Sequence, residues 1–290
     1  MKIGIALAGG GLKGVAYIGA LKAFEDLGIK FDCISGTSSG SMAATLYSMG
    51  YSCNDMKNII NSSYKKIVKI KKTPIISSVG VYLTGGKFKM NGLIPGERLE
   101  NVINDVVIKK ECNLISDIKV PLAVATVDSI SGKECLILSQ KCRNSRPNIE
   151  YLYDVPISTA VRASMSFPGV FTPSKYKSYS FIDGGARDNL PIGALKDMGA
   201  DITIGLDFKM SSYDYENANI FNTLLRSVDI FSQSNRALAR QEANLVIEID
   251  AEDAGLIGIR DVEKCIESGY ETIMKNKEII YNTIKQPNRS

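Results

Sequence analysis

The chain contains no histidine among its 290 residues. Histidine is the usual general base of serine hydrolases, so nucleophilic chemistry on a serine must here use Asp, Glu or Lys as the proton acceptor. The same absence argues against a zinc site of the usual Cys/His kind, as do six cysteines scattered without a C-x-x-C pair. We therefore expect neither a metal ion nor another cofactor.

Long apolar runs are also missing. No run reaches the roughly 20 residues that a membrane-spanning helix needs. The first eight residues form a short apolar segment that leads directly into glycines, unlike the pattern of a secretory signal peptide. We expect a cytoplasmic protein with reduced thiols.

The chain also lacks a strong excess of positive or negative charge. The net charge is +4, from 35 basic and 31 acidic residues, which is too small to indicate a nucleic-acid partner. A lysine-rich run, Tyr64 to Lys72, has interleaved apolar residues and could lie on an anionic lipid surface. The other interpretation is a solvated helix face, so peripheral contact with an anionic membrane stays open.

The most informative segment that is present runs from Gly36 to Gly40, with the sequence Gly-Thr-Ser-Ser-Gly. It follows an apolar segment, 31–34, and precedes a helical pattern, which makes it a G-x-S-x-G motif in the setting of a nucleophile elbow. Small residues on both sides let the chain turn sharply and present Ser38 at a helix N-terminus. Taken alone, the segment is equally compatible with an ordinary turn and helix cap.

A glycine-rich loop, Gly9 to Gly14, follows the first predicted strand and precedes a helix. It fits the G-x-G-x-x-G fingerprint of dinucleotide-binding proteins, but the acidic residue, Asp32, lies at the start of the second strand rather than at its end. In the other interpretation the N–H groups of Gly10 and Gly11 form an oxyanion hole. Because the loop and the elbow follow adjacent strands, both would then act on one carbonyl group.

The general base that histidine cannot supply is best provided by Asp183. It ends a predicted strand and is followed by Gly184 and Gly185, which allow close approach of other groups. Asp-Gly-Gly by itself is commonly only a turn. In combination with the glycine loop and Ser38, it indicates a catalytic carboxylate.

The order of the predicted elements is strand, glycine loop, helix, strand, glycine turn, helix. This order is typical of an α/β fold with a mainly parallel sheet and both loops at its C-terminal edge. The segment 75–91 is expected to be a flexible or extended loop bordering the active site. Further strands are predicted over 120–127, 134–139, 179–182, 201–208 and 245–249, and further helices over 54–70, 95–110, 155–166, 191–198, 218–243 and 259–284.

Four ordered blocks together resemble the patatin-like phospholipase family. They are Gly9 to Gly14, Gly36 to Gly40, the segment Ala163 to Pro168 with Phe171 and Pro173 nearby, and Asp183-Gly184-Gly185 with Asn189 and Pro191. The resemblance covers about residues 1–207. It implies a three-layer α/β/α sandwich, a Ser-Asp dyad, and metal-free hydrolysis of fatty-acyl esters of lipids.

The resemblance also assigns roles by motif position. Ser38 would be the nucleophile and Asp183 the base. Lys13 stands where the family more often has arginine, so the charge is kept but the guanidinium fork is not. The oxyanion hole would be formed by Gly9, Gly10, Gly11, Lys13 and Gly14, with Gly36, Gly40, Gly184 and Gly185 supporting the motifs.

We therefore expect a single patatin-like domain over 1–290, with a C-terminal α/β extension over 208–290. The expected activity is a metal-independent phospholipase A or lysophospholipase that works through an acyl-enzyme on phospholipid or lysophospholipid. The alternatives are a catalytically idle lipid- or nucleotide-binding protein and an acyltransferase. With an ordinary carboxyl pKa of about 3.9, activity would not fall steeply between about pH 7 and 6.

Overall fold

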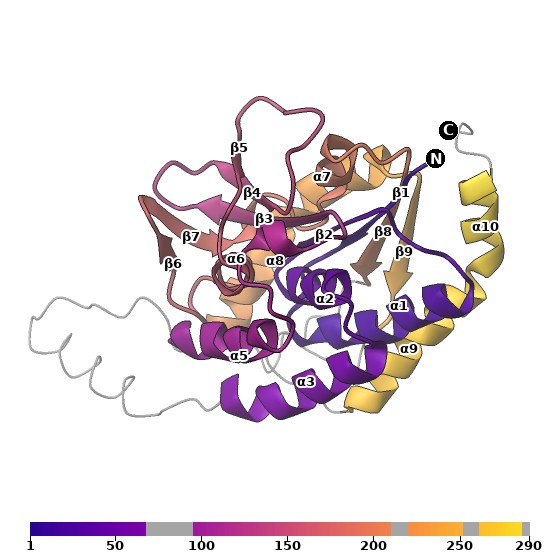
Figure 1. Cartoon of the computed structure of the whole chain (residues 1–290), viewed down its shortest axis with the longest axis horizontal. Helices are drawn as coiled ribbons and strands as arrows, with labels where there is room; N and C mark the ends of the chain where they lie inside the picture. The colour runs from indigo at the N-terminus through magenta and orange to yellow at the C-terminus, as the bar shows by residue number, and fades with distance from the viewer. Residues whose placement is uncertain (68–94, 210–219, 252–260, 286–290) are drawn as a thin grey trace, which may run out of the picture.

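A single mixed sheet organises the protein. The computed structural model describes residues 1–67, 95–209, 220–251 and 261–285. Within them, nine strands form a sheet whose main order is β5-β4-β3-β2-β1-β8-β9 (Figure 1), with β7 on β3 and β6 on β7. The strands are β1 Ile3–Leu7, β2 Cys33–Thr37, β3 Leu122–Asp128, β4 Glu134–Leu138, β5 Ile149–Leu152, β6 Ser174–Tyr176, β7 Tyr179–Asp183, β8 Ile202–Phe208 and β9 Leu245–Ile249.

Helices cover both faces of this sheet (Figure 1). The helices are α1 Ala16–Asp26, α2 Ser39–Ser48, α3 Cys53–Ile67, α5 Glu97–Ile108, α6 Ile157–Ser164, α7 Ile192–Asp197, α8 Ile220–Glu242, α9 Val262–Lys275 and α10 Lys277–Lys285, with a 3-10 turn over Gly11–Val15. One apolar core lies under α1, α2, α5, α6 and α9. A second core includes residues of α7, and Ala239 near the end of α8 packs against it. This arrangement confirms the predicted three-layer α/β/α fold.

The centre of the sheet is parallel, as predicted. Strand β1 pairs in parallel with β2 and β8, and β2 pairs in parallel with β3. All residues of β2, β3 and β8 are buried, as expected for strands covered on both faces. The loops that follow β1 and β2 therefore emerge at one edge of the sheet.

The last helices pack back onto the first. Gly19 of α1 lies against the backbone carbonyl of Ile266, and Gly269 of α9 lies against the carbonyl of Ala16. A methyl group at either glycine would overlap that backbone, so the two helices meet at backbone distance. The segment 261–285 thereby covers the helix that follows the glycine loop.

Most predicted elements are present, with some differences in extent. The second strand is displaced toward the elbow, Cys33–Thr37 instead of 31–34. The predicted helix 259–284 is two helices separated at Asn276. The short strands β5 and β6 were missed, since three or four residues carry little alternation. The predicted loop 75–91 and the run after Ile67 lie outside the described residues.

Candidate active site

The nucleophile elbow has the geometry that its sequence predicts. Ser38 has φ 53° and ψ −124°, a left-handed conformation that is strained for a residue with a side chain. It directly precedes α2. Gly36 is needed because a Cβ there would lie 2.5 Å from the carbonyl oxygen of Gly40. Gly40 in turn lies against the carbonyls of Leu7 and Ala8 at the end of β1.

The sheet brings Ser38 and Asp183 together end to end. Strand β2 pairs with β3 up to Thr37, which is opposite Ala125. Strand β7 pairs with β3 in the antiparallel sense and ends with Asp183 opposite Thr126. Because β4 occupies the other edge of β3 at these positions, β2 and β7 share one edge and their C-terminal ends face each other. The last residue of β2 and the predicted base are therefore opposite consecutive residues of β3, Ala125 and Thr126.

The two side chains are hydrogen-bonded. The hydroxyl of Ser38 donates to Asp183 Oδ2 at 2.6 Å, and the N–H of Gly185 donates to Asp183 Oδ1 at 2.8 Å. Asp183 is only 3% exposed. Burial raises the pKa of Asp183 from its ordinary value of 3.8 to about 6, although both hydrogen bonds oppose the shift.

This pKa changes one expectation. A flat activity profile between about pH 7 and 6 presumed an ordinary carboxyl pKa. With a pKa of about 6, a base at Asp183 becomes protonated as the pH falls through that range. Burial thus moves the Asp183 carboxyl into the range in which histidine titrates, and the buried carboxyl predicts a fall in activity where an ordinary carboxyl predicts none. The pH profile of activity decides between these two predictions.

The glycine loop lies beside Ser38, but its N–H groups are not equivalent. The N–H of Gly9 donates to the backbone carbonyl of Asn189 at 3.1 Å, and the N–H of Gly10 donates to the hydroxyl of Ser39 at 3.2 Å. The N–H of Gly11, where φ is 61°, makes no hydrogen bond within the described part of the chain. Gly11 is therefore one loop residue whose N–H is available to an anion, and Gly10 becomes another if the Ser39 hydroxyl turns away.

Two aromatic residues, Phe208 and Tyr17, pack beneath the glycine loop on the side of the protein core. A Cβ on Gly10 would lie 2.5 Å from the ring of Phe208, which in turn contacts the ring of Tyr17 at a centroid distance of 4.9 Å. The hydroxyl of Tyr17, fully buried, donates to the carbonyl of Ala8 at 2.7 Å. Because the ring of Phe208 lies so close, position 10 has room only for glycine.

Asn189 connects the glycine loop with the segment that follows Asp183. Its side-chain amide donates to the carbonyl of Gly9 at 3.2 Å. A Cβ on Gly9 would meet its Oδ1 at 2.6 Å, and a Cβ on Gly185 would meet it at 2.9 Å. In the sequence Asn189 belongs to the Asp183 block of the resemblance, and no local pattern of residues predicts its place between the two loops.

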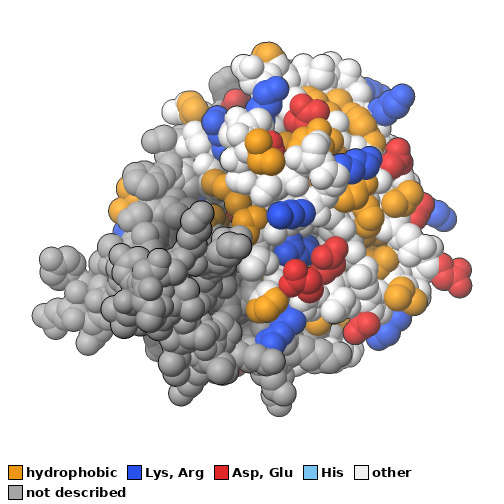
Figure 2. All heavy atoms as spheres, turned by 90° about the vertical axis from the view of Figure 1, so that its left-hand side faces the viewer, with side chains coloured by type: hydrophobic (Ala, Val, Ile, Leu, Met, Phe, Trp, Pro, Cys, Tyr) orange, Lys and Arg blue, Asp and Glu red, His pale blue; other side chains and the backbone are white. Residues whose placement is uncertain are grey.

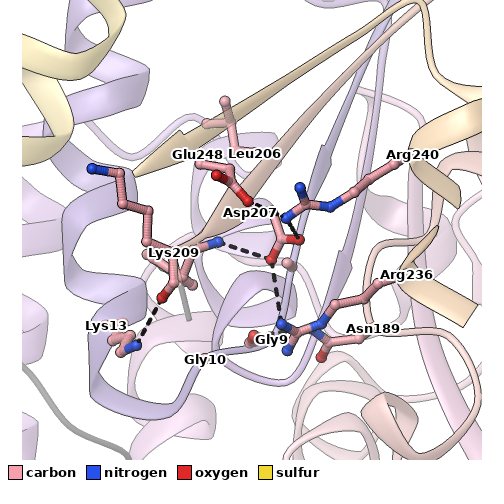
Figure 3. Close-up of polar contacts among 12 residues, drawn as sticks. Gly9, Gly10, Lys13, Asn189, Leu206, Asp207, Lys209, Arg236, Arg240 and Glu248 are labelled. Carbon is pink, nitrogen blue, oxygen red and sulfur yellow. Dashed lines mark hydrogen bonds and ion pairs between the residues drawn. The ribbon is translucent and has the colours of Figure 1, made fainter. Parts of the chain in front are cut away.

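Lys13 and Gly14 have different surroundings. Figure 3 shows the Lys13 ammonium directed at the backbone carbonyl of Lys209, which it contacts at 3.4 Å. Gly14 leaves room for Ser39, whose side-chain atoms would lie 2.6 Å from a Cβ there. Gly14 thus supports the residue next to the nucleophile, and the side chain of Lys13 ties the loop to the end of β8.

Ser164, the last residue of α6, contacts Ser38, which the sequence did not predict. The hydroxyl of Ser164 accepts the Ser38 N–H at 2.9 Å and donates to the carbonyl of Ala125 at 2.6 Å. Two residues later, the carbonyl of Ser166 accepts the Asp183 N–H at 3.0 Å. Both serines belong to a block of the resemblance, which was the available signal.

The dinucleotide interpretation of the glycine loop is not favoured by the position of Asp32. Its carboxylate accepts the N–H of Ile3 at 2.8 Å, at the start of β1. The loop follows the other end of that strand. Asp32 therefore lies at the opposite edge of the sheet, as its place in the sequence predicted.

The surface carries charges of both signs. Figure 2 shows Lys and Arg side chains lying among Asp and Glu side chains on the described part of one face. No helix in the ranges that the structure describes is long and apolar enough to cross a bilayer.

Comparison with known proteins agrees with this geometry. The model of the family described as patatin-like phospholipase matches residues 5–196. The lysophospholipase nte1 of Aspergillus fumigatus is 26% identical over 270 residues, which are 90% of this chain but 15% of that protein. The chain thus spans a small part of this fungal relative. An uncharacterized protein of Bacillus subtilis, YqhO, is 24% identical over 263 residues, covering 85% of this chain and 87% of YqhO.

Among solved structures, human GIVD cytosolic phospholipase A2, crystallised with methyl gamma-linolenyl fluorophosphonate, has a similar fold. The TM-score is 0.50 with 12% sequence identity, and the match covers 98% of this chain and 59% of the human chain. At this identity the likeness concerns the fold alone.

Proposed function

The chain belongs to the patatin-like phospholipase family, and from this premise we propose that it is a metal-independent serine hydrolase of phospholipid or lysophospholipid esters. The observation that carries the proposal is the 2.6 Å hydrogen bond from Ser38 to Asp183 in a chain without histidine. A hydroxyl at a strained elbow, bonded to a buried carboxylate, is the arrangement of a nucleophile with its base.

The first half of the reaction forms an acyl-enzyme. Asp183 takes the proton from Ser38 as the serine oxygen attacks the ester carbonyl carbon, giving a tetrahedral intermediate. When the intermediate collapses, the bond to the alcohol oxygen breaks and the proton held by Asp183 passes to that oxygen. The products are the free alcohol, such as a glycerophospho compound, and the fatty acyl group as an ester of Ser38.

The second half returns the enzyme to its starting state. Asp183 takes a proton from a water molecule that attacks the acyl-enzyme, and gives it to Ser38 as the fatty acid leaves. The raised pKa suits this role, because a base with a pKa of about 6 binds a proton better than an ordinary carboxylate. The oxygen anion of each intermediate would be stabilised by the N–H of Gly11 and, after the Ser39 hydroxyl turns, by that of Gly10.

The substrate class is supported by the names of relatives. The fungal proteins similar to this chain are called lysophospholipases. Because the chain corresponds to only 12 to 15% of their length, carrying their activity over to it is part of the proposal. A peripheral contact with an anionic membrane is a further part of it, since the substrates are lipids.

The test is hydrolysis of a medium-chain p-nitrophenyl ester, and then of lysophosphatidylcholine, with EDTA present throughout. Wild-type turnover is expected, and both Ser38→Ala and Asp183→Asn should lose at least about 10³-fold in kcat. Circular dichroism checks that the variants are folded. Reaction with an alkyl fluorophosphonate should label the wild type on Ser38, with loss of fluoride, and leave Ser38→Ala unlabelled.

Each other outcome points to a defined alternative. Turnover that persists in either variant rules out the dyad. An inactive wild type that still binds lipid, equally well after Ser38→Ala, indicates an idle binding protein. Transfer of the acyl group to an added alcohol in preference to water indicates an acyltransferase.

A further inference from the structure

The backbone N–H of Ser38 falls between two elements. Strand β2 ends at Thr37, and the carbonyl of Ser38 already belongs to the first turn of α2, where it accepts the N–H of Ser41 at 2.9 Å. The N–H of Ser38 belongs to neither the strand nor the helix. Its acceptor is the hydroxyl of Ser164, a residue that is fully buried.

The hydroxyl occupies a place in the hydrogen-bond ladder between β2 and β3. The N–H of Ile34 donates to the carbonyl of Pro121 at 2.8 Å. In a parallel ladder this bond recurs every second residue, so the third bond of the series would run from Ser38 to the carbonyl of Ala125. Instead, Ser38 donates to Ser164 and Ser164 donates to Ala125. One oxygen atom has been inserted into the ladder.

The inserted oxygen determines how far Ser38 stands from β3. A direct bond would bring the Ser38 N–H to about 2.9 Å from the carbonyl of Ala125, whereas the bridged path has two bonds in series. The serine hydroxyl suits this position because it accepts with one lone pair while donating its own hydrogen. Gly184, next to the base, packs against the same carbonyl of Ala125.

The base is held from the same short segment. The N–H of Asp183 donates to the carbonyl of Ser166 at 3.0 Å, and the hydroxyl of Ser166 donates to the carbonyl of Arg162 at 2.8 Å. The end of α6 therefore binds the backbone of both dyad residues. A shift of Ser164 relative to Ser166 would change the separation of Ser38 and Asp183.

We propose that Ser164 is a positioning residue whose hydroxyl, inserted between Ser38 and Ala125, sets the distance from the nucleophile to the base. This inference rests on the proposed hydrolase function. Ser164 acts through the backbone of Ser38 and touches no reacting atom. Without its hydroxyl, the elbow closes onto β3 or takes up water, and Ser38 leaves its place beside Asp183.

The decisive variants are Ser164→Thr and Ser164→Val, which have nearly the same shape and differ in the hydroxyl. Any strain from the added methyl group is common to both. Because only the Thr variant keeps a hydroxyl, its kcat should be at least about 10-fold higher than that of the Val variant. The KM values of the two variants should agree within about 2-fold. Equal kcat values in the two variants would overturn the proposal.

Ser139 provides a matched control. Its buried hydroxyl also accepts a backbone N–H, that of Leu122 on the same strand β3, at 2.9 Å. Ser164→Ala and Ser139→Ala each leave a buried backbone N–H without its acceptor, so both should lower the midpoint of urea unfolding. Only Ser164→Ala should lower kcat by about 10- to 100-fold. Equal losses of kcat in the two alanine variants would show that Ser164 is merely structural.

The pH profile gives a second readout. The hydrogen bond from Ser38 lowers the pKa of Asp183, so weakening it lets that pKa rise. The acid limb of kcat in Ser164→Ala should therefore move to higher pH than in the wild type, and the limb of Ser139→Ala should not move.

Amide hydrogen exchange tests the positioning role of Ser164 without relying on enzyme activity. The peptide containing Ser38 should exchange faster in Ser164→Val than in Ser164→Thr, since only the threonine accepts the Ser38 N–H. If the wild type proves inactive, the proposed function fails, yet this exchange difference still decides whether Ser164 holds the elbow. Identical exchange in the two variants would refute the positioning role.

Discussion

Two buried aspartates at strand ends have opposite surroundings. Asp207, at the end of β8, is fully buried and lies 2.7 Å from the guanidinium of Arg240 and 3.9 Å from that of Arg236 (Figure 3). Asp183, at the end of β7, is 3% exposed, and among the described residues its carboxylate receives hydrogen bonds from Ser38 and Gly185. Within the described residues, no lysine or arginine forms an ion pair with Asp183.

The difference separates a carboxylate paired with cations from one that is proposed to act as a base. The arginines from α8 compensate the charge of Asp207 and connect that helix to the sheet beside the glycine loop. No charged side chain in the described ranges compensates the charge of Asp183, and burial raises its pKa to about 6. A carboxylate kept buried without a cation is costly for stability, and such groups are concentrated where proton transfer is needed.

The largest expected effect is on catalysis at Asp183. Asp183→Asn should reduce kcat by about 10³-fold or more, because an amide cannot accept the proton of Ser38. Asp207→Asn should reduce kcat far less, since Asp207 does not contact Ser38. Steady-state kinetics on one ester, with both variants at pH 8, makes the comparison. A larger loss in the Asp207 variant would reverse the assignment of the two carboxylates.

The next effect is on the stability contributed by Asp207. Asp207→Asn leaves two arginines facing a neutral amide, one of them with a side chain only 15% exposed. We expect the free energy of unfolding to fall by about 2 to 4 kcal/mol, measured by urea denaturation. A loss below about 1 kcal/mol would mean that solvent or Glu248 compensates the arginines.

Asp183→Asn should raise the free energy of unfolding, whereas Asp207→Asn should lower it. The pKa of Asp183 is higher in the folded state than in the unfolded chain, so ionising it destabilises the fold. At pH 8 the variant should therefore be more stable than the wild type, by up to about 3 kcal/mol. This advantage should shrink as the pH falls through about 6 and vanish below about 4, where the wild-type carboxyl is protonated in both states. Thermal unfolding at pH 8 and pH 4.5 tests the sign, and a variant less stable at pH 8 would contradict it.

The smallest effect is expected at Arg240. Its guanidinium contacts both Asp207 and Glu248, but its side chain is 36% exposed, and Arg236 remains near Asp207 when it is removed. Arg240→Gln should therefore cost only about 1 kcal/mol of unfolding free energy. The loss should decrease in 1 M salt, and a loss as large as that of Asp207→Asn would show that Arg236 contributes little.

Local features could be predicted from the sequence because they depend on near neighbours in the chain. The elbow at Ser38 requires small residues on both sides, and the glycines at 36 and 40 are adjacent to it. The mainly parallel sheet followed from the alternation of apolar strands, glycine turns and helices. Asp183 could be proposed as the base because the absence of histidine left few acceptors.

What the sequence by itself determined was therefore the local geometry of the elbow and the set of residues from which a nucleophile and a base can be proposed. The tertiary structure decided how those residues meet: β2 and β7 end facing each other along β3, and Ser164 bridges Ser38 to Ala125. It also decided the pKa of Asp183, which depends on burial by segments distant in the chain. Distances and desolvation arise only when such segments pack together, so no local pattern of residues records them.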